Sequence, residues 1–309
     1  MKIAAVIVTF NRLPLLQECI ESLLNNTRKP DTIYVVNNGS TDGQTPQWLD
    51  TQPYLKVIHQ ENVGSAGGFY TGIKRAYEDG YDWVWLMDDD GKPAPDALEK
   101  LLNAALQIPD GKVFNSIVIN KNDAKKDEIV FGYNVGMNVN DMSNVMTYHS
   151  LKELLATGNK IFDGGAQFFN ASLIHRVVIE KVGLPDARLF IRGDEVEYLF
   201  RIQKAGFKTY TVAESIIFHP KPASVYVMLG KLKLFYYEPM NSFKLYYHIR
   251  NLIYLNRKYS ISNNLIKIAA FYLKEFLFWK QNNFSIKKMS ENFATIQKAI
   301  RDGYALPIQ

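Results

Sequence analysis

Short apolar runs alternate with helical segments along the first 110 residues. The runs are rich in residues that favour strands, and we expect strands at Ile3–Val8, Thr32–Val36, Leu55–Ile58 and Trp83–Met87. The intervening segments repeat apolar residues at helical spacing, and we expect helices at Leu13–Asn25, Phe69–Glu78 and Asp96–Leu106. Strands that alternate with helices of this length predict an α/β fold, with a mostly parallel sheet covered by helices on both faces.

The remainder of the chain reads as a mixed region followed by a helical one. We expect a strand at Val113–Ile119, an irregular polar segment at Asn120–Leu155, helices at Ala171–Val182 and Glu195–Ala205, and short strands at Lys208–Val212 and Ser215–Phe218. Beyond Pro222 the pattern changes to long helical stretches. The sequence therefore predicts one domain over residues 1–222, with halves at about 1–110 and 111–222, and a helical extension over residues 223–309.

Three adjacent carboxylates, Asp88, Asp89 and Asp90, follow the fourth predicted strand directly. They repel one another unless a cation lies among them, and ligands of open α/β sheets bind at this carboxyl edge. Hard oxygen ligands suit Mg²⁺ or Mn²⁺, which keep positions open for phosphate oxygens. The alternative is a solvated acidic turn that caps the helix after Pro93.

Composition limits the class of protein. The chain has 309 residues, of which 47% are hydrophobic, so a folded protein with a substantial core is expected. Its single cysteine, Cys19, excludes an internal disulfide and is consistent with a reducing cytosol. The first apolar run is too short for a secretion signal, because Asn11 and Arg12 follow it at once. We therefore expect a cytoplasmic location.

Four loops follow predicted strands and should converge at one edge of the sheet. They are Thr9–Arg12, Asn37–Asp42, Asn62–Gly68 and Asp88–Asp90. Glycines in the third loop, Gly64, Gly67 and Gly68, would let backbone amides approach a negatively charged ligand, although each glycine can equally serve a turn.

These four motifs, in this order, resemble the glycosyltransferases of family 2, inverting enzymes of the GT-A (Rossmann-like) fold, over roughly residues 2–220. The resemblance is to the bacterial rhamnosyl and galactofuranosyl branch. The pairing of Gly-Ser-Ala-Gly-Gly-Phe with Leu-Met-Asp-Asp-Asp is closer to the galactofuranosyl members.

The resemblance implies a role for each motif. Asp88 and Asp90 would bind Mn²⁺ or Mg²⁺, and Arg12 would lie near the phosphates. The remaining residues implied to bind the nucleotide sugar are Thr9, Phe10, Asn38, Asn62, Gly64, Gly67, Gly68 and Asp89. The chain departs from the family's Asp-Asp-Gly-Ser turn, because it has Asn37-Asn38-Gly39-Ser40. An asparagine offers both a donor and an acceptor, so the identity of the nucleotide base stays open.

A second acidic pair, Asp194-Glu195, begins a predicted helix. Inverting transfer needs a carboxylate that takes the proton of the acceptor hydroxyl, and the helix dipole favours an ionised group there. By the resemblance Glu195 is the base, with Asp194 as the second choice. The structural alternative is that Asp194 caps the helix and Glu197 pairs with Arg201.

Other candidate residues come from the same resemblance. It implies that His219 is a further metal ligand, whereas a lone histidine is more often a buried, hydrogen-bonded residue. Candidates for the acceptor site are Asp163, Gly165, Phe168 and Arg250. Phe168 can simply be part of the core, and Arg250 can lie on the polar face of a helix.

The carboxyl-terminal region is basic and aromatic. Between Lys221 and Arg301 the sequence has 14 lysines and arginines against 3 glutamates. Such a region can face nucleic acid, a phosphorylated substrate or an anionic membrane. The segment Leu265–Trp279 is too charged and short to span a membrane, so we expect a helix that lies on the membrane surface or packs against protein.

The leading hypothesis is a metal-dependent glycosyltransferase, peripheral on the inner face of the plasma membrane. It would transfer galactofuranose from UDP-galactofuranose to a bacterial cell-surface glycan or a lipid-linked oligosaccharide. The alternatives are transfer of rhamnose from dTDP-rhamnose and a non-catalytic glycan-binding module. No nucleic acid partner is expected, and a homo-oligomer is compatible with the sequence.

Overall fold

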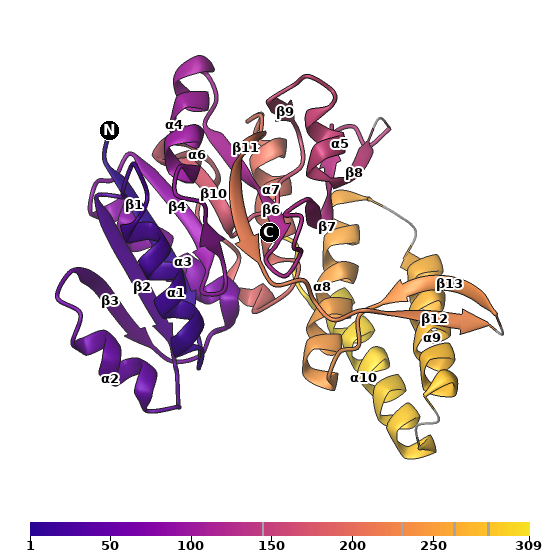
Figure 1. Ribbon diagram of the computed structural model, residues 1–309. Coiled ribbons are helices and arrows are strands. Elements are labelled where there is room, and N and C mark those ends of the chain that lie inside the picture. Colours follow the sequence, from indigo (N-terminus) through magenta and orange to yellow (C-terminus); the bar gives the residue numbers. More distant parts are fainter. Residues whose placement is uncertain (144, 230, 262–263, 283–284) are drawn as a thin grey trace. The chain divides into compact units, whose positions relative to one another are not determined.

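The computed structural model describes residues 1–143, 145–229, 231–261, 264–282 and 285–309 (Figure 1). The chain forms two compact units. The first contains Met1–Phe190 and Asp194–Lys221, and the second contains Ile191–Gly193 and Pro222–Gln309. The segment Ile191–Gly193 therefore belongs to the second unit, although its neighbours in the sequence belong to the first.

Four parallel strands begin the first unit. They pair in the order β3-β2-β1-β4 and are β1 (Ile3–Thr9), β2 (Thr32–Asn38), β3 (Leu55–Gln60) and β4 (Trp83–Asp88). Helices connect them: α1 (Leu13–Leu24), α2 (Gln44–Asp50) and α3 (Gly64–Glu78). The predicted alternation of strand and helix is confirmed, and the carboxyl ends of these strands lie at one edge of the sheet. The helix α2 was not predicted, and α3 begins five residues before its predicted start at Phe69.

Three further strands widen the sheet and break its parallel order. They are β6 (Val113–Asn120), β10 (Asn170–His175) and β11 (Tyr210–His219). β10 lies between β4 and β6 and is antiparallel to both, whereas β6 and β11 are parallel. The helix predicted at Ala171–Val182 is therefore wrong in its first part, since only α6 (Arg176–Val182) is helical. β10 is buried on both faces, so its apolar residues do not alternate, and neither glycine nor proline separates it from α6.

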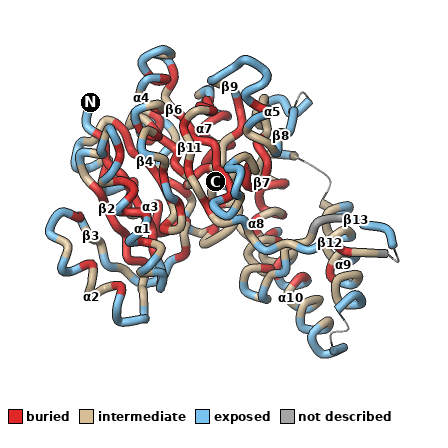
Figure 2. Tube along the Cα trace, viewed as in Figure 1, coloured by how far each residue is buried: buried red, intermediate tan, exposed pale blue. Residues whose placement is uncertain are grey.

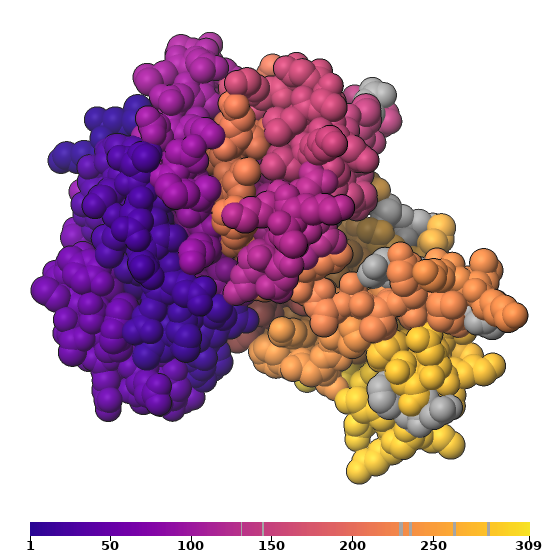
Figure 3. All heavy atoms as spheres, viewed as in Figure 1, coloured from indigo at the N-terminus to yellow at the C-terminus, as the bar shows by residue number. Residues whose placement is uncertain are grey.

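The strand β11 replaces the two short strands expected at Lys208–Val212 and Ser215–Phe218. Its pairing with β6 shifts between Val212 and Ile216, which accommodates extra residues within one strand. The two-residue strand β5 (Lys92–Pro93) pairs with β11 at Ile217 and Phe218. Figure 3 shows part of β11, in orange, at the surface of this unit.

The segment Asn120–Leu155 is more ordered than its polar sequence indicates. It contains β7 (Glu128–Val135), β8 (Met146–Ser150) and α5 (Leu151–Leu155). β7 and β8 form an antiparallel hairpin, and β7 also pairs with β6. The short β9 (Ile161–Asp163) pairs with the start of β11. The expectation of an irregular segment is thus wrong for these elements.

The core of the first unit lies on the two faces of the sheet (Figure 2). On one face α1 and α4 (Ala97–Gln107) pack on alternate residues of the strands, among them Ile7 and Trp85. On the other face α3 contacts β1 and β2, and its glycines Gly68 and Gly72 lie against Val8 and Val6. Helices on both faces confirm the predicted fold class.

The second unit is helical but begins with a hairpin that the sequence analysis did not anticipate. The hairpin consists of β12 (Val225–Leu229) and β13 (Leu232–Tyr237). The helices α8 (Ser242–Tyr259), α9 (Asn264–Gln281) and α10 (Ile286–Ala305) follow. Leu245, Ile249 and Ile253 of α8 pack with Ile296 and Ala299 of α10. The three helices described after Pro222 agree with the predicted change of pattern.

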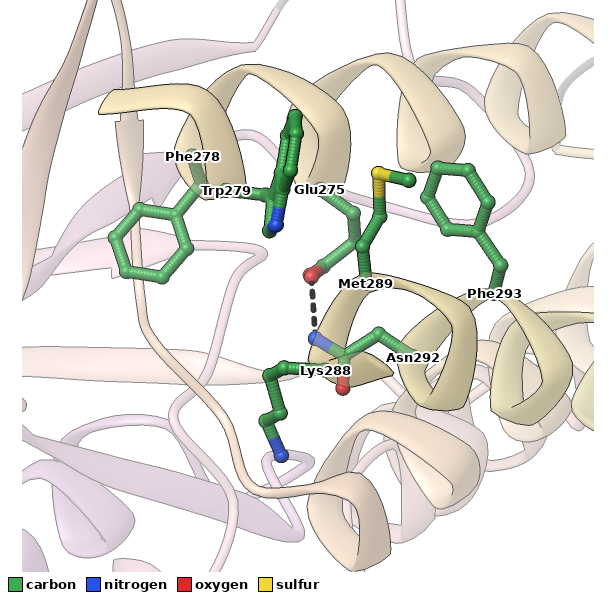
Figure 4. Close-up of a pocket in the computed structure, with 7 residues that line it drawn as sticks. All are labelled: Glu275, Phe278, Trp279, Lys288, Met289, Asn292 and Phe293. Carbon is green, nitrogen blue, oxygen red and sulfur yellow. Dashed lines mark hydrogen bonds between the residues drawn. The ribbon is translucent and has the colours of Figure 1, made fainter. Parts of the chain in front are cut away.

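The helix α9 has an unusual distribution of side chains. Its only buried residue is Glu275, which accepts a hydrogen bond from the Tyr237 hydroxyl. Glu275 also accepts one from Asn292 Nδ2 on α10, as Figure 4 shows. Leu265 and Leu273, in contrast, are 73% and 54% exposed. None of the helices in the described part of the chain is long and apolar enough to cross a membrane.

Candidate active site

The acidic turn lies beside the end of β11. β4 ends at Asp88, whose backbone N–H donates to the Phe169 carbonyl at 2.9 Å, and Gly91 N–H closes the turn on the Asp88 carbonyl at 3.1 Å. A Cβ on Gly91 would lie 2.8 Å from Ile217 Cδ1, so glycine lets the turn approach β11. The pairing of β5 with β11 then brings the carboxylates to His219.

Asp88, Asp90 and His219 form one cluster. One ligand atom from each residue lies within 4.8 Å of the other two. His219 Nδ1 is 2.7 Å from the Pro220 carbonyl oxygen, which can only accept, so Nδ1 carries a hydrogen. His219 Nε2 faces Asp90 Oδ1 at 3.0 Å and is the atom left to bind a metal. Two carboxylates and one imidazole suit Mn²⁺, so this donor set fits a divalent ion.

The electrostatics of the cluster favour a cation. Burial raises the pKa of Asp88 first, and the negative charge of Asp90 raises it further. Burial also raises the pKa of Asp90, but the hydrogen bond and charge of His219, together with Arg12, outweigh it and lower that pKa below its usual value. A bound cation would favour the ionised form of both carboxylates.

The middle carboxylate turns toward the loop after β1. Asp89 is buried and accepts a hydrogen bond from Thr9 Oγ1 at 2.7 Å. Arg12 Nη1 lies 3.1 Å from Asp89 Oδ1 and 3.0 Å from Asp90 Oδ2. Burial raises the pKa of Asp89 to about 6 although Arg12 and Thr9 oppose the shift. Thr9, Arg12 and the acidic turn are thus brought together as expected, while Phe10 is exposed beside them.

The Asn38 side chain holds the loop after β3. Its Nδ2 donates to the Gly64 carbonyl at 3.0 Å and to Asn62 Oδ1 at 3.3 Å. Its Oδ1 accepts from Gln60 Nε2 at 2.8 Å and from Val63 N–H at 3.3 Å. The amide is therefore fully used by the protein, and it fixes Asn62 and Gly64 next to the β2 loop.

The three glycines expected in a loop lie within α3. Gly64 begins the helix with φ +75°, and a Cβ there would overlap the Phe190 carbonyl. A Cβ on Gly67 would overlap Val63, and one on Gly68 would overlap Val8. Contacts within the protein account for all three glycines, so helix α3, rather than a glycine-rich loop, points its amino end toward this region.

The second acidic pair begins α7 (Asp194–Lys204), as predicted. Asp194 is buried, and its Oδ2 accepts a hydrogen bond from Ser65 Oγ at 2.9 Å, whereas Glu195 is partly exposed. The predicted pair of Glu197 and Arg201 forms, with Arg201 Nε and Nη2 at 3.1 and 2.9 Å from the carboxylate oxygens. Glu195 therefore stays partly exposed beside the buried Asp194 and the ion pair of Glu197 with Arg201.

Two of the candidates for the acceptor site, Asp163 and Gly165, lie away from the cluster within the first unit. Asp163 pairs with Tyr210 at the start of β11. On the neighbouring strand β6, the partners of Tyr210 and His219 are six residues apart, so Asp163 lies roughly 20 Å from the level of His219 at 3.3 Å per residue. Gly165 accepts a hydrogen bond from Thr211 Oγ1 near the same end. Phe168 is buried and contacts Tyr198 edge to face, as a core residue does. Arg250 lies on α8 in the second unit, where it stacks on Tyr247.

Two features near these side chains were missed from the sequence. Ser65 had no assigned role, although it joins α3 to Asp194. Asn11, Phe169 and Phe190 have positive φ angles of 55°, 66° and 65°. Such conformations are costly for phenylalanine, although asparagine tolerates them, and they concentrate at functional loops. A serine within a glycine-rich motif was the only available signal, because positive φ at phenylalanine has no sequence pattern.

Comparison with known proteins identifies the family. The family model for "Glycosyl transferase family 2" matches residues 4–176, more than half of the chain. The chain belongs to glycosyl transferase family 2. This glycosyltransferase is 29% identical to galactofuranosyltransferase GlfT1 of Mycolicibacterium smegmatis over 82% of each chain. It is 31% identical to GlfT1 of Mycobacterium tuberculosis over 86% of this chain and 84% of the relative.

More distant relatives agree with the family. An undecaprenyl-phosphate mannosyltransferase of Micrococcus luteus is 31% identical over 37% of this family 2 chain and 52% of the relative. Among solved structures, GalNAc-T7 with UDP, GalNAc and Mn²⁺ superposes with a TM-score of 0.57 at 12% identity, covering 99% of this chain and 56% of that one. At this identity the likeness concerns the fold alone, which is GT-A.

Proposed function

We propose that this glycosyltransferase transfers galactofuranose from UDP-galactofuranose, with inversion, to a hydroxyl of a growing cell-surface glycan or lipid-linked oligosaccharide. The observation that carries the donor is the similarity to galactofuranosyltransferases over 82% or more of the chain. In this proposal residues 1–110 bind the nucleotide sugar, and residues 111–222 provide the base and contact the acceptor.

The donor side follows from the acidic turn. Asp88, Asp90 and His219 would hold Mn²⁺ or Mg²⁺, which supplies Lewis acidity to the diphosphate leaving group when bound. Arg12 contacts Asp89 and Asp90 and can also reach a neighbouring phosphate, since a guanidinium has several donors. Thr9 fixes Asp89, which would then accept from the ribose or the sugar. Asn38 supports this pocket through the loop that it holds.

The acceptor side follows from α7. The Glu195 carboxylate would take the proton of the acceptor hydroxyl as its oxygen attacks the anomeric carbon opposite the diphosphate. Glu195 is partly exposed and can reach a substrate, whereas Asp194 is buried. Attack from the face opposite the leaving group inverts the anomeric centre.

Activity and binding measurements test this function. With Mn²⁺ present, we expect turnover of UDP-galactofuranose and no turnover of dTDP-rhamnose. Asp90→Ala should abolish turnover and the metal-dependent thermal stabilisation by UDP, while Asp110→Ala, an exposed matched control, should change neither. Turnover of dTDP-rhamnose instead would show that the donor is dTDP-rhamnose and not UDP-galactofuranose. A binding module would show no turnover and would keep its affinity for glycan in Asp90→Ala.

The apolar face of α9 suggests where the enzyme meets its acceptor. We propose that this face lies on an anionic membrane at the cytoplasmic side. Leu265, Ile266, Leu273 and Phe276 are exposed along the helix, and Figure 2 shows α9 largely in tan and pale blue. Exposed lysines follow at the turn into α10, namely Lys280, Lys287 and Lys288. Apolar residues beside lysines match a bilayer surface with negative headgroups.

Vesicle binding tests the membrane proposal. The protein should sediment with vesicles that contain phosphatidylglycerol, less with pure phosphatidylcholine, and high salt should release it. Leu273→Ser with Phe276→Ser should reduce sedimentation at least several-fold. Leu106→Ser, which changes an even more exposed leucine on α4 in the first unit, should not. Unchanged sedimentation of the double variant, or a dimer that it disrupts, would contradict membrane contact through α9.

A further inference from the structure

Helices α3 and α7 are joined at their amino ends. Ser65, the second residue of α3, donates to Asp194 Oδ2 at 2.9 Å, and Asp194 is the first residue of α7. The backbone repeats this contact, because Ala66 N–H donates to the Phe190 carbonyl at 3.0 Å. The start of α3 therefore lies directly against the residues that lead toward Asp194.

Within the described part of the chain, Asp194 lacks the cation that a buried carboxylate needs. It is 1% exposed, and none of the described basic side chains forms an ion pair with it. Glu197, one turn later, is equally buried but is bound by Arg201 through two nitrogens. An ionised carboxyl group without a cation is strongly disfavoured in such a position. The ionised form is therefore stabilised at Glu197 but not at Asp194.

The neighbouring acid strengthens the contrast. Burial raises the pKa of Asp194 well above its usual value, and both the charge of Glu195 and a hydrogen bond between the two carboxyl groups raise it further. Two carboxyl groups in contact share one proton, which stays on the more buried member. Ser65 Oγ can donate to Asp194 whether or not Asp194 carries a proton.

We propose that Asp194 is an uncharged positioning residue that donates its carboxyl proton to the Glu195 carboxylate, and that Ser65 fixes Asp194 in this orientation. The inference rests on the proposed function, in which Glu195 is the base. During transfer the acceptor O–H proton passes to Glu195, the acceptor oxygen bonds to the anomeric carbon, and the diphosphate leaves with the electron pair of its bond. Asp194 keeps its own proton throughout.

The hydrogen bond from Ser65 to Asp194 also connects the base to the donor side of the domain. Ser65 belongs to the helix whose amino end faces the donor region, so the orientation of the base depends on a residue from the donor half of the domain. Loss of the hydroxyl should therefore disturb the proton transfer more than the binding of the donor.

Substitution of Asp194 by its amide tests the proposal directly. Asparagine has the same size, accepts from Ser65 and donates to Glu195, but it cannot act as a base. We expect Asp194→Asn to keep kcat within about tenfold of the wild type, whereas Glu195→Gln should lose about 10²- to 10⁴-fold, as expected for loss of a general base. Asp194→Ala should fall well below Asp194→Asn, because it lacks the donor.

The serine provides an independent measurement. Ser65→Ala should lower kcat several-fold while KM for the nucleotide sugar changes less than twofold, and Ser65→Thr should restore kcat. Folding is checked for every variant by circular dichroism and Tm. A folded Asp194→Asn as inactive as Glu195→Gln would overturn the inference, as would a Ser65→Ala variant with wild-type kcat. Full activity of Glu195→Gln would instead refute the base assigned in the proposed function.

Discussion

His219 Nε2 faces Asp90 Oδ1 at 3.0 Å, and the opposite nitrogen of the ring is bound to the Pro220 carbonyl. This arrangement joins the last residue of β11 to the acidic turn after β4. The carbonyl fixes both the tautomer and the ring orientation, so Nε2 is presented to the carboxylates in advance.

Removal of the imidazole should weaken metal binding. We expect His219→Ala to raise the Mn²⁺ concentration required for half-maximal activity by at least about 10-fold, because one of the three proposed protein ligands is lost. Titration of the purified enzyme with Mn²⁺ measures this change. His175→Ala is the matched control, since His175 also ends a strand of the sheet but is not part of the cluster. An unchanged Mn²⁺ requirement in His219→Ala would remove His219 from the metal site.

Arg12 should oppose metal binding while the nucleotide is absent. Its guanidinium lies 3.0 Å from an Asp90 oxygen, and like charges repel. We expect Arg12→Ala to bind Mn²⁺ several-fold more tightly in the absence of nucleotide and to raise KM for the donor. Calorimetric titrations with and without UDP separate the two effects. Weaker Mn²⁺ binding by Arg12→Ala in both titrations would contradict this account.

The protonation of Asp194 predicts a pH dependence of stability. The unfolded chain ionises this group near pH 3.8, and burial raises its pKa in the folded state. The folded state therefore binds the extra proton above pH 4, and its stability falls as pH rises, by up to about 1.4 kcal/mol per pH unit. Asp194→Asn has no such dependence. The Tm of the variant minus the Tm of the wild type should therefore increase from pH 4 to 7 and stay constant below pH 4. Thermal unfolding at several pH values measures this, and parallel Tm curves would show that Asp194 is ionised.

Two glycines with positive φ should respond differently to alanine. Gly64 and Gly206 have φ angles of +75° and +91°, but an added Cβ overlaps Phe190 only at Gly64. Gly206→Ala should cost about 1 kcal/mol of unfolding free energy from backbone strain alone. Gly64→Ala should cost at least 1–3 kcal/mol more, roughly the cost of overpacking. Urea unfolding of both variants gives the difference, and equal losses would mean that Phe190 moves aside freely.

Two ion pairs with the same spacing should contribute differently to the unfolding free energy, because they differ in burial. Glu197 and Arg201 are four residues apart, and the Glu197 side chain is fully buried while that of Arg201 is 25% exposed. Lys74 and Glu78 have the same spacing, but both side chains are about half exposed. Glu197→Gln should lose roughly 3 kcal/mol, since it leaves part of a buried pair uncompensated. Glu78→Gln should lose no more than about 0.5 kcal/mol. Comparable losses in urea unfolding would indicate that water reaches Glu197.

The elements of the first half of the fold could be predicted because each shows its pattern of apolar residues within a short stretch of sequence. Strands β1 to β4 are short apolar runs bounded by turn residues, and α1 has apolar residues at helical spacing with Pro14 in its first turn, where it is tolerated. β10 was read as a helix because a fully buried strand has no alternation and α6 follows without a break. The hairpin β7–β8 was missed because polar residues mask its short apolar segments.

The candidate site shows the same division. Asp88, Asp90 and His219 were predicted to act together, and parallel strands bring them to one edge of the sheet. The contact of Ser65 with Asp194 spans 129 positions and left no pattern in a single sequence. The saturation of the Asn38 amide was equally invisible, because four partners become neighbours only when the β2 and β3 loops pack together.

The three residues Ile191–Gly193 limit how this enzyme can be shortened. Asn251 Nδ2 on α8 donates to the carbonyls of Ile191 and Arg192 at 3.0 and 2.7 Å, and Arg192 pairs with Glu238. A fragment that ends at Lys221 would retain the acidic turn and the pair Asp194-Glu195. It would lose Asn251 and Glu238, and with them these hydrogen bonds and this ion pair to the residues just before Asp194. Truncation to improve handling should therefore produce a protein that still binds nucleotide but transfers sugar poorly.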